Sequence, residues 1–401
     1  VSIFVLLLLA VPIGAAFYLA TLIGADLVNI PIDTFASMPY QAINSFPLLA
    51  IPLFILAGQI MNRGRLVAKL VELAEMFLFW LKGMLGYVTI IASAFLGAIT
   101  GSSVATVAAV GSIIGNRMVN KGYKKGYVAA LIAACGLLGV LIPPSISLIV
   151  YGAAVGASIS ELFLATLVPG IIMVVAFLGV HFLSIKNVLT NGVEASDDSP
   201  SGNFIRQSKL VTFKKSVPVL VMPVIILGGI YGGIFTPTEA AAAAGVYGLM
   251  VAIVTKTLNI KEIPSVFFQS AITAAAILTI IAFTSVFNKL LILEQIPQQL
   301  AELITGITTS PVIFLLLVNL VLLIVGMFME TNAAVLLMGP LLIPAAREFG
   351  IDPIHFGIIV VTNIELGLIT PPLAANVYVS AKTNNSSLIE MFPYLVRFFI
   401  A

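Results

Sequence analysis

The chain is 401 residues long, and 60% of its residues are hydrophobic while 9% are charged. Soluble domains have about 45–50% apolar and about 25% charged residues, so this composition excludes a cytosolic enzyme, a secreted disulfide scaffold and a disordered protein, and it indicates a protein of the lipid bilayer. The net charge of +2 offers no basic surface, so no nucleic-acid partner is expected.

Ten stretches without charged residues follow one another along the chain. A bilayer core about 30 Å thick is crossed by about 20 apolar residues in a helix. Backbone amides in lipid must be hydrogen-bonded within the protein, and these stretches lack the alternation of barrel strands, so all are expected to be helical. They are residues 1–25, 34–62, 83–116, 126–160, 162–185, 216–238, 240–255, 263–288, 303–329 and 366–381.

Basic residues concentrate in three connections between these stretches. Lysine and arginine in short connections favour the cytoplasm, so all three connections are placed there. The first connection, residues 61–82, also carries apolar residues at helical spacing and is expected to form an amphipathic helix along the membrane. The basic residues are Arg63, Arg65, Lys69 and Lys82, then Arg117, Lys121, Lys124 and Lys125, then Lys186, Arg206, Lys209, Lys214 and Lys215.

Residues 83–116 lie between two cytoplasmic connections, so they must cross the membrane an even number of times. Gly101-Ser102-Ser103 divides them into two legs, 84–100 and 104–116. At 1.5 Å per residue the second leg reaches only about 20 Å, which is short of a full crossing. A re-entrant hairpin is therefore predicted, with a tip that is buried in protein or lines a water-filled cavity.

Two prolines stand side by side only at Pro143-Pro144 and Pro371-Pro372, which coincide after a shift of 228 residues. Because glycine and proline set backbone shape, further matches of these types in one register indicate an internal repeat, with chance similarity between apolar helices as the alternative. The other coinciding pairs are Gly139 with Gly367, Gly122 with Gly350, Gly111 with Gly339, Ala105 with Ala333 and Val107 with Val335, while Ser103 falls on Thr331.

Equivalent connections in the two copies differ in charge. Residues 117–125 contain four basic residues and no acid, whereas residues 345–353 contain Arg347, Glu348 and Asp352. By the positive-inside rule the first faces the cytoplasm and the second faces the opposite side. The halves are therefore expected to form an inverted repeat, which is typical of secondary transporters, joined by the polar connection 186–215.

Each half offers a polar hairpin tip and a helix broken by glycine and two prolines. Proline frees backbone carbonyl groups, which can coordinate Na⁺ at half-helix C-termini, whereas helix N-termini favour an anion. Hydroxyl and amide oxygens also suit a hard cation. One Na⁺ site per half is predicted, with an anionic solute between them; a simple packing kink at each Pro-Pro is the alternative. The tips are Gly101-Ser102-Ser103 with Thr106, and Glu330-Thr331-Asn332; the breaks are Gly139 to Ser145 and Gly367 to Pro372.

Three acidic residues lie in or against apolar stretches, where an ionised carboxylate is costly. Glu330 and Glu365 are candidates to bind a proton or balance a cation; a helix N-cap for Glu330 and a backbone hydrogen bond for Glu365 are the alternatives. Glu239 follows Thr236-Pro237-Thr238 and is expected to begin a helix. Asn288 ends an apolar stretch and is expected at the membrane interface.

Enzyme motifs are missing from the sequence. There is no Walker lysine in a glycine loop, no nucleophile elbow and no zinc motif. His181 and His355 have no other soft ligand near them, so no metal other than Na⁺ is expected. The chain is expected not to be an enzyme, to need no cofactor, and to be driven by an ion gradient with Na⁺ as the coupling ion.

Four motifs together resemble the large membrane (permease) subunit of tripartite ATP-independent periplasmic (TRAP) transporters. They are Gly97 to Thr106, Gly139 to Ser145, Gly232 to Ala240 and Gly367 to Pro372. The resemblance covers nearly the whole chain. Because the family usually has another apolar span after the point where this chain stops, a truncated C-terminal segment is expected.

The resemblance implies an all-α integral membrane protein of the elevator type, with two re-entrant hairpins and two broken helices in a mobile transport domain. It implies a bacterial inner-membrane location, a small four-helix membrane subunit as partner and a periplasmic binding protein that delivers the solute. Transport would be import coupled to Na⁺. The solute would be a carboxylate, such as a C4-dicarboxylate, a sialic acid, another sugar acid or an ectoine-like compound.

Carried over to this sequence, the family's sites give two Na⁺ positions, and the geometry of the tips adds a solute position between them. The Na⁺ positions are Gly101, Ser102, Ser103, Thr106, Gly139 and Pro143 in the first half, and Glu330, Thr331, Asn332, Gly367, Thr370 and Pro371 in the second. The solute position lies near Ser103, Ser145, Asn332 and Asn376.

The expected division of the chain follows from these assignments. Residues 1–82 and 161–310 form the scaffold, 83–160 and 311–385 form the transport elements of the two repeats, and 386–401 form the C-terminal segment. Two alternatives stay open: a stand-alone Na⁺- or H⁺-coupled dicarboxylate symporter without a binding protein, and a channel-like or scaffolding membrane protein.

Overall fold

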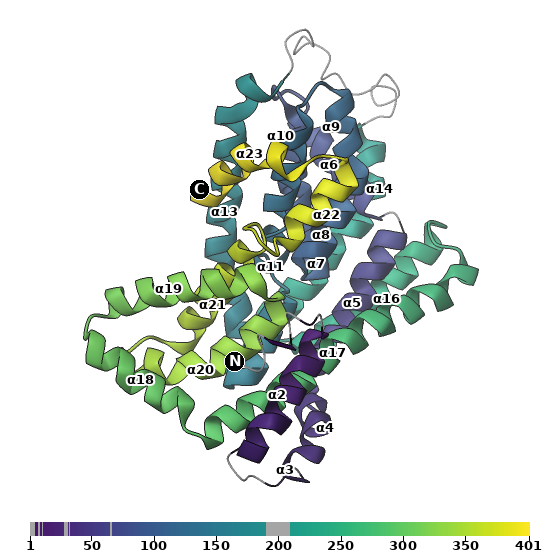
Figure 1. Ribbon diagram of the computed structural model, residues 1–401. Helices are drawn as coiled ribbons and strands as arrows, with labels where there is room; N and C mark the ends of the chain where they lie inside the picture. The colour runs from purple at the N-terminus through teal and green to yellow at the C-terminus, as the bar shows by residue number, and fades with distance from the viewer. Residues whose placement is uncertain are drawn as a thin grey trace.

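Helices make up every regular element of the described chain in the computed structural model (Figure 1). The structure describes residues 11–27, 31, 33–64, 66–189 and 209–401, together with Val5, Leu6 and Leu9. Most of the connection 186–215 falls outside the described residues, and so do Arg65 and Arg206.

The helices are labelled as in Figure 1. The first part of the chain contains α2 (Ile13–Leu27), α3 (Asp33–Ala36), α4 (Met38–Ile43), α5 (Ala50–Arg63), α6 (Leu66–Leu78), α7 (Met84–Thr100), α8 (Ser103–Val110), α9 (Asn116–Asn120), α10 (Lys125–Cys135), α11 (Leu138–Leu141), α12 (Ile146–Val155) and α13 (Ile159–Val188). The second part contains α14 (Lys209–Pro223), α15 (Gly229–Tyr231), α16 (Pro237–Val254), α17 (Ile263–Leu293), α18 (Ile296–Ile307), α19 (Pro311–Phe328), α20 (Thr331–Glu348), α21 (Pro353–Gly367), α22 (Ala375–Asn384) and α23 (Leu388–Ile400).

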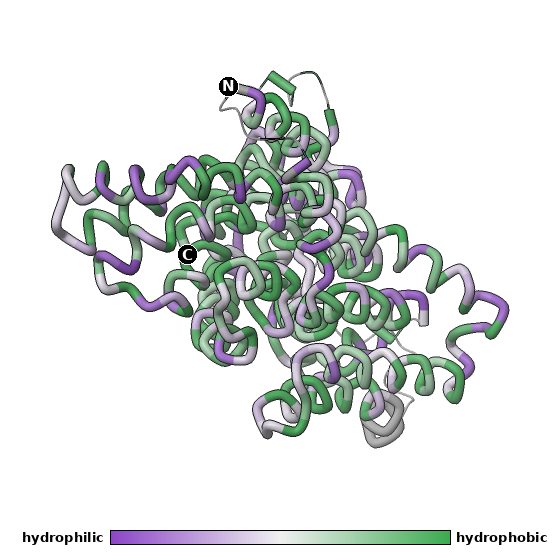
Figure 2. Tube along the Cα trace, turned by 90° about the horizontal axis from the view of Figure 1, so that it is seen from below, coloured by the Kyte–Doolittle hydropathy of each residue, from purple (hydrophilic) through white to green (hydrophobic). Residues whose placement is uncertain are grey.

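Five helical segments of the described chain are individually long and apolar enough to cross a membrane, and the pair Lys125–Leu141 and Ile146–Val155, bent by 43°, would add a sixth. The five are Phe46–Arg63, Ile159–Val188, Pro237–Val254, Ile260–Leu293 and Pro311–Phe328. Hydrophobic residues, green in Figure 2, run through most of the helices, and many large apolar side chains, such as Leu183 (77% exposed), are exposed on the protein surface. Such a surface fits lipid, and the prediction of an all-helical membrane protein is confirmed.

Several of the predicted apolar stretches contain more than one helix. The stretch 34–62 is interrupted at Asn44 and Ser45, 303–329 contains the end of α18 and the start of α19, and 366–381 crosses the gap between α21 and α22. A proline explains the break before α19, because Pro311 opens this helix and disfavours helical backbone at Ser310 before it.

The 228-residue register relates whole elements. Shifted by this amount, α8, the π-helical turn Gly111–Gly115 and α9 coincide with α20, while α10 with α11 coincides with α21 to within two residues. Gly122 and Gly350 both take left-handed backbone with φ of +85° and +69°, and both Pro-Pro peptide bonds are cis. The counterpart of the predicted amphipathic helix α6 is α18, which the sequence analysis had joined to the apolar stretch after it.

The two halves complete each other's cores. The C-terminal helices α22 and α23, yellow in Figure 1, lie across α8 and α10, and α12 packs on α20 in return. Tyr151 of α12 donates a hydrogen bond to the Pro353 carbonyl at 2.8 Å. Its ring lies against Gly339 and Gly357, where a Cβ atom on Gly357 would come within 2.3 Å of it. A close fit of this kind makes the two halves one packed body.

The helices α5, α16 and α17 pack together and reach the second half through α20. Asn288 of α17 is buried and donates to the Leu336 carbonyl at 2.6 Å, so its predicted interfacial position is wrong. Pro340 explains the contact, because it has no N–H to bond the carbonyl four residues before it. The asparagine amide supplies the missing donor.

Candidate functional site

The first hairpin tip is a tight turn between α7 and α8. Gly101 follows the end of α7 with φ of +61°, a left-handed conformation that favours glycine. The Ser102 hydroxyl caps α8 by accepting the Ala105 amide. The Gly101 carbonyl then accepts the amide of Ile146, the first residue of α12, at 3.1 Å. The tip is thus bonded directly to the first broken helix at its break.

The second tip lies between α19 and α20 and is also capped and close to its break. Glu330 caps α20 by accepting the Ala333 amide at 3.1 Å, so the N-cap proposed as an alternative is present. The Met327 carbonyl accepts the amide of Leu373 within the second break at 2.9 Å. In each half, therefore, a hairpin and a helix break share a backbone hydrogen bond.

Glycines allow each break to approach its hairpin closely. A Cβ atom on Gly139 would lie 2.5 Å from the Thr106 hydroxyl and 2.8 Å from the Ser102 carbonyl. A Cβ atom on Gly367 would lie 2.3 Å from the carbonyl carbon of Gly326. The repeated glycine of the sequence motif therefore has a steric cause, because no other residue fits at either junction.

Pro143 and Pro371 lie in the breaks. Residues 142–145 separate α11 from α12, and residues 368–374 separate α21 from α22, so the predicted interruptions are confirmed. Ser145 begins the second part of the first broken helix, where its buried hydroxyl accepts the Leu148 amide at 3.4 Å. The structure thus gives this predicted solute residue a capping role.

Two predicted cation ligands make local hydrogen bonds at these junctions. The Thr106 hydroxyl donates to the Ser102 carbonyl at 2.9 Å and lies 3.2 Å from the Thr100 hydroxyl. The Thr370 hydroxyl donates to the Leu366 carbonyl at 2.9 Å. A hydroxyl that donates its proton keeps lone pairs for a cation, so both residues stay available as ligands.

Hydrogen bonds also cross from each half to the other. The Ser103 hydroxyl of the first tip donates to Oδ1 of Asn376 on α22 at 3.4 Å. The Ser147 hydroxyl of α12 donates to Oδ1 of Asn332 at the second tip at 3.3 Å. All four side chains are buried. Sequence reasoning missed Ser147, although its position matches that of Asn376 to within one residue in the 228-residue register.

Three buried polar atoms at this crossing lack a hydrogen-bond partner among the described residues: Oγ1 of Thr331, Oε2 of Glu365 and Nδ2 of Asn376. The Glu365 carboxyl group interacts with the side chains of both Ser103 and Thr331, one from each hairpin tip. The alternative role of Glu365, a carboxyl group hydrogen-bonded to the backbone, does not account for Oε2, which has no such bond. Unsatisfied polar atoms in a packed interior indicate a site for a ligand.

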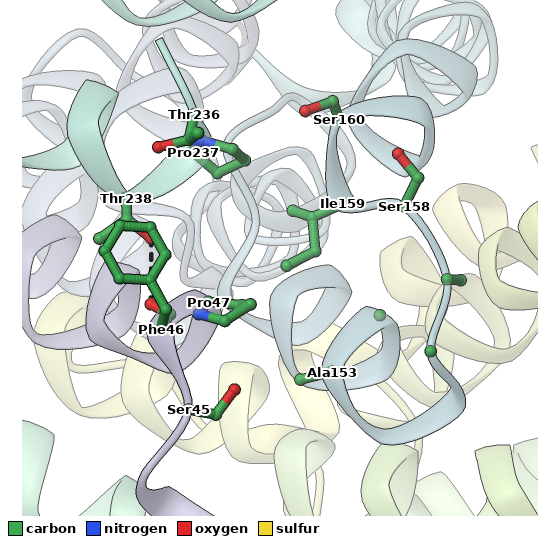
Figure 3. Close-up of a pocket in the computed structure, with 13 residues that line it drawn as sticks. Ser45, Phe46, Pro47, Ala153, Ser158, Ile159, Ser160, Thr236, Pro237 and Thr238 are labelled. Carbon is green, nitrogen blue, oxygen red and sulfur yellow. Dashed lines mark hydrogen bonds between the residues drawn. The ribbon is translucent and has the colours of Figure 1, made fainter.

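A cavity of about 450 Å³ lies apart from the tips, where α16 begins beside the α12–α13 connection (Figure 3). Thr238 donates to the Phe46 carbonyl at 3.2 Å on one wall of this cavity. Thr236 and Glu239 form a reciprocal capping box at the start of α16, which confirms the helix start expected for Glu239. The motif Gly232 to Ala240 therefore shapes this cavity and adds nothing to the tip junctions.

A smaller crevice of about 90 Å³ separates the first tip from the neighbouring helices. Gln59 and Asn62 of α5 face Thr100 and Ser102 across it, and Thr273 of α17 also lines it. Polar and apolar side chains both line it, and it holds the volume of a few water molecules. The first tip is thus reached along the surface of α5.

The sequence matches the family model described as tripartite ATP-independent periplasmic transporter, DctM component, over residues 1–401. It is 38% identical over 350 residues to the C4-dicarboxylate TRAP transporter large permease protein DctM of Pseudomonas aeruginosa, covering 87% of this chain and 80% of that protein. It is 32% identical over 402 residues to the sialic acid TRAP transporter large permease protein SiaM of Vibrio cholerae, covering 98% and 92%.

A third relative is the isethionate TRAP transporter permease protein DctMQ of Oleidesulfovibrio alaskensis, 37% identical over 388 residues. The match covers 96% of this chain but only 59% of that longer protein. Among solved structures, the fold is similar to the YdaH transporter of Alcanivorax borkumensis (TM-score 0.65, 13% identity, 93% of this chain and 86% of that one). It is also similar to MtrF of Neisseria gonorrhoeae (TM-score 0.53, 12% identity, 93% and 83%). At these identities the likeness concerns the fold alone.

Proposed function

The chain belongs to the DctM-component family of tripartite ATP-independent periplasmic transporters, which are multi-pass permeases of the bacterial membrane and not enzymes, and we propose that it imports an organic acid in symport with Na⁺. The observation that carries the proposal is the duplicated junction, in which each hairpin is hydrogen-bonded to a helix break, through Gly101 and Ile146 in the first half and through Met327 and Leu373 in the second. Each junction gathers backbone carbonyls and hydroxyls in a buried place.

The chemistry of each junction suits a small hard cation. Na⁺ takes oxygen ligands from carbonyls, hydroxyls and amide side chains, and half-helix C-termini provide such carbonyls. The N-terminus of α12 is bonded to the first tip through Gly101, and that of α22 is bonded to it through Asn376, so the amides of both helices would favour an anionic group beside this tip. Na⁺ would therefore bind at both tips, and the solute anion would lie between them, beside Asn332 and Asn376.

The fold supports an elevator mechanism built on an inverted repeat. The interlocked halves, residues 83–160 and 311–385, form one body through the contacts of α12 with α20 and of α8 with α22. A body packed in this way is suited to move as a unit against a scaffold that includes α5 and α17. The crevice beside α5 is the surface along which this movement would pass.

The solute class follows from the relatives. Their names specify C4-dicarboxylates, sialic acid and isethionate, all of them organic anions. A carboxylate is the first candidate for this chain. A periplasmic binding protein would deliver it, and a small membrane subunit would complete the permease. The greater length of the isethionate relative is consistent with additional permease parts beyond those matched by this chain.

Uptake into proteoliposomes tests the proposal. This chain and its small subunit would be reconstituted, and the labelled solute would be supplied by its binding protein under an inward Na⁺ gradient. Accumulation that requires both Na⁺ and the binding protein is expected. Uptake that persists with choline in place of Na⁺ contradicts Na⁺ coupling, and uptake without the binding protein indicates the stand-alone symporter. Equilibration without accumulation indicates a channel.

A further inference from the structure

Glu365 occupies an unusual position between the two halves. It lies on α21, which ends two residues later at the second break, and its side chain is only 1% exposed. No lysine, arginine or histidine in the described part of the chain forms an ion pair with it. The groups beside it are Ser103 of the first tip and Thr331 of the second, with Glu330 acting on it electrostatically. Both hairpin tips therefore converge on one carboxyl group.

These groups leave some of one another's polar atoms without a hydrogen bond. Oε2 of Glu365 and Oγ1 of Thr331 have no hydrogen-bond partner within the described residues, although both residues are at least nine-tenths buried. An uncompensated carboxylate in a dry interior is strongly disfavoured, so the native protein must either supply a positive charge or keep the carboxyl group protonated. A single carboxylate that is surrounded by oxygen atoms without hydrogen-bond partners is suited to bind a cation.

The charge of the bound cation can be inferred from Glu330, the neighbouring acidic residue. The Glu330 carboxylate is already engaged, because it accepts the Asn332 side-chain amide at 2.7 Å and the Ala333 backbone amide at 3.1 Å. Glu365 is thus the carboxylate with a free oxygen. One carboxylate with neutral hydroxyls suits a monovalent hard cation, since a divalent ion usually gathers several carboxylates.

We propose that Glu365, Ser103 and Thr331 form a third Na⁺ site, which is shared by the two halves because it takes one hydroxyl from each hairpin tip. This inference rests on the proposed Na⁺ coupling and adds to it. Because its ligands come from both hairpins and from α21, the site is complete only when both tips are in place. The free Nδ2 donor of Asn376 lies beside it through the Ser103 hydrogen bond, where it can hold an anionic oxygen of the solute. Na⁺ here would offset the repulsion between that anion and Glu365.

Sodium titration of transport tests this site. The reconstituted permease would be compared with Glu365→Gln and Glu365→Asp variants, with Glu302→Gln on the exposed face of α18 as the control. For Glu365→Gln, the Na⁺ concentration for half-maximal uptake should rise at least about tenfold, as expected for loss of a charged ligand, and the Hill coefficient should fall by about one. Glu365→Asp should recover part of this loss, and Glu302→Gln should behave as the unaltered protein.

Equilibrium binding of ²²Na⁺ to the purified permease provides a second readout that needs no transport. Glu365→Gln should bind about one Na⁺ fewer per chain. If Glu365→Gln does not reach the membrane, the Glu365→Asp titration decides in its place, and an unaltered midpoint overturns the site. Na⁺-independent uptake by the unaltered permease would defeat the proposed function. Na⁺-dependent uptake with unchanged titration in the Glu365 variants would defeat the shared site alone.

Discussion

Gly367 shows how one missing side chain positions the second junction. Its Cα lies so close to Gly326 that a methyl group would come within 2.3 Å of the carbonyl carbon and 2.6 Å of the Cα there. Gly367→Ala should therefore lower the unfolding free energy by about 1–3 kcal/mol, as overpacking does. A thiol-reactive dye can follow unfolding in detergent, because the one cysteine, Cys135, is fully buried.

Gly179 provides the control for this change. It lies within α13, and nothing approaches within 4 Å of a Cβ atom there. Gly179→Ala should leave the unfolding temperature unchanged or raise it slightly, because alanine favours helix more than glycine does. Equal effects of the two substitutions would show that the Gly326–Gly367 approach does not matter for stability.

The tip residues Ser103 and Asn332 should affect sodium use more than folding. Each takes part in one hydrogen bond to the opposite half, and each belongs to a predicted Na⁺ position. Ser103→Ala and Asn332→Ala should raise the Na⁺ concentration for half-maximal uptake while the amount of protein in the membrane falls less. Immunoblots and uptake at graded Na⁺ measure the two effects, with Thr279→Ala on the exposed side of α17 as control. A parallel fall of protein and uptake would indicate a purely structural role.

At the residue scale, the sequence identified functional residues that are marked by their neighbours in the chain, and it missed contacts between residues that lie far apart in the chain. Ser102, Ser103 and Asn332 could be found because polar residues between apolar runs mark a turn. Ser147 could not be found in this way, because its partner lies 185 residues away and no local pattern joins them. The convergence of Glu365 with Ser103 has the same cause, since packing alone brings them together.

An ion pair joins the amphipathic helix α6 to the end of the first hairpin. Arg117 of α9 lies 2.6 Å from the Glu75 carboxylate, and Glu75 is 5% exposed. Burial raises the pKa of Glu75 above its ordinary value of 4.5, and the Arg117 charge offsets this only in part. The folded protein therefore binds this proton more tightly than the unfolded chain does.

The sign of the pH effect follows from that difference. The stabilising contribution of Glu75 is fully present below its unfolded pKa and is lost as the pH rises through the raised folded value. The unfolding temperature of the unaltered protein should therefore fall relative to Glu75→Gln as the pH is raised from about 4 to about 8. Scans in detergent would measure this, with Glu302→Gln as the control. If the unfolding temperature of the unaltered protein instead rose relative to that of Glu75→Gln with increasing pH, the Arg117 charge would outweigh the effect of burial on the pKa of Glu75.

At the element scale, the breaks could be predicted because proline and glycine act on the backbone whatever surrounds them. Helix α18 could not be found from charge-free length, since its apolar face merges in sequence with α19. Its helical periodicity and its place opposite α6 in the 228-residue register are the signals that identify it. Asn288 was misplaced because only the folded chain shows that Pro340 frees the Leu336 carbonyl.

At the scale of the molecule, the interlocking of the halves would couple the two tips in the proposed transport. Each tip bonds the break of its own half and a side chain of the other half, through the pairs Ser103–Asn376 and Ser147–Asn332. A cation that orders one tip therefore affects the surroundings of the other. Such mutual dependence would make Na⁺ and solute bind together, which a symporter requires to avoid leaking either one.

An elevator movement would carry this body past α5, and engineered disulfides can test it. A Cβ atom on Gly58 of α5 would lie 3.5 Å from that of Thr100 on α7, and one on Gly111 would lie 3.5 Å from that of Thr383 on α22. Both separations fit a disulfide, which needs about 3.5–4.5 Å. In the proposed elevator the first pair would join the scaffold to the moving body, whereas the second would lie within that body.

In a Cys135→Ala background, oxidation of the Gly58→Cys/Thr100→Cys protein should abolish uptake, and a reductant should restore it. The same oxidation of the Gly111→Cys/Thr383→Cys protein should leave uptake nearly unchanged, because that bond moves with its surroundings. Gel mobility after proteolysis confirms each cross-link, and each protein serves as its own reduced control. Full uptake by the oxidised first pair would show that α5 and α7 travel together, and the moving body would then have to include α5.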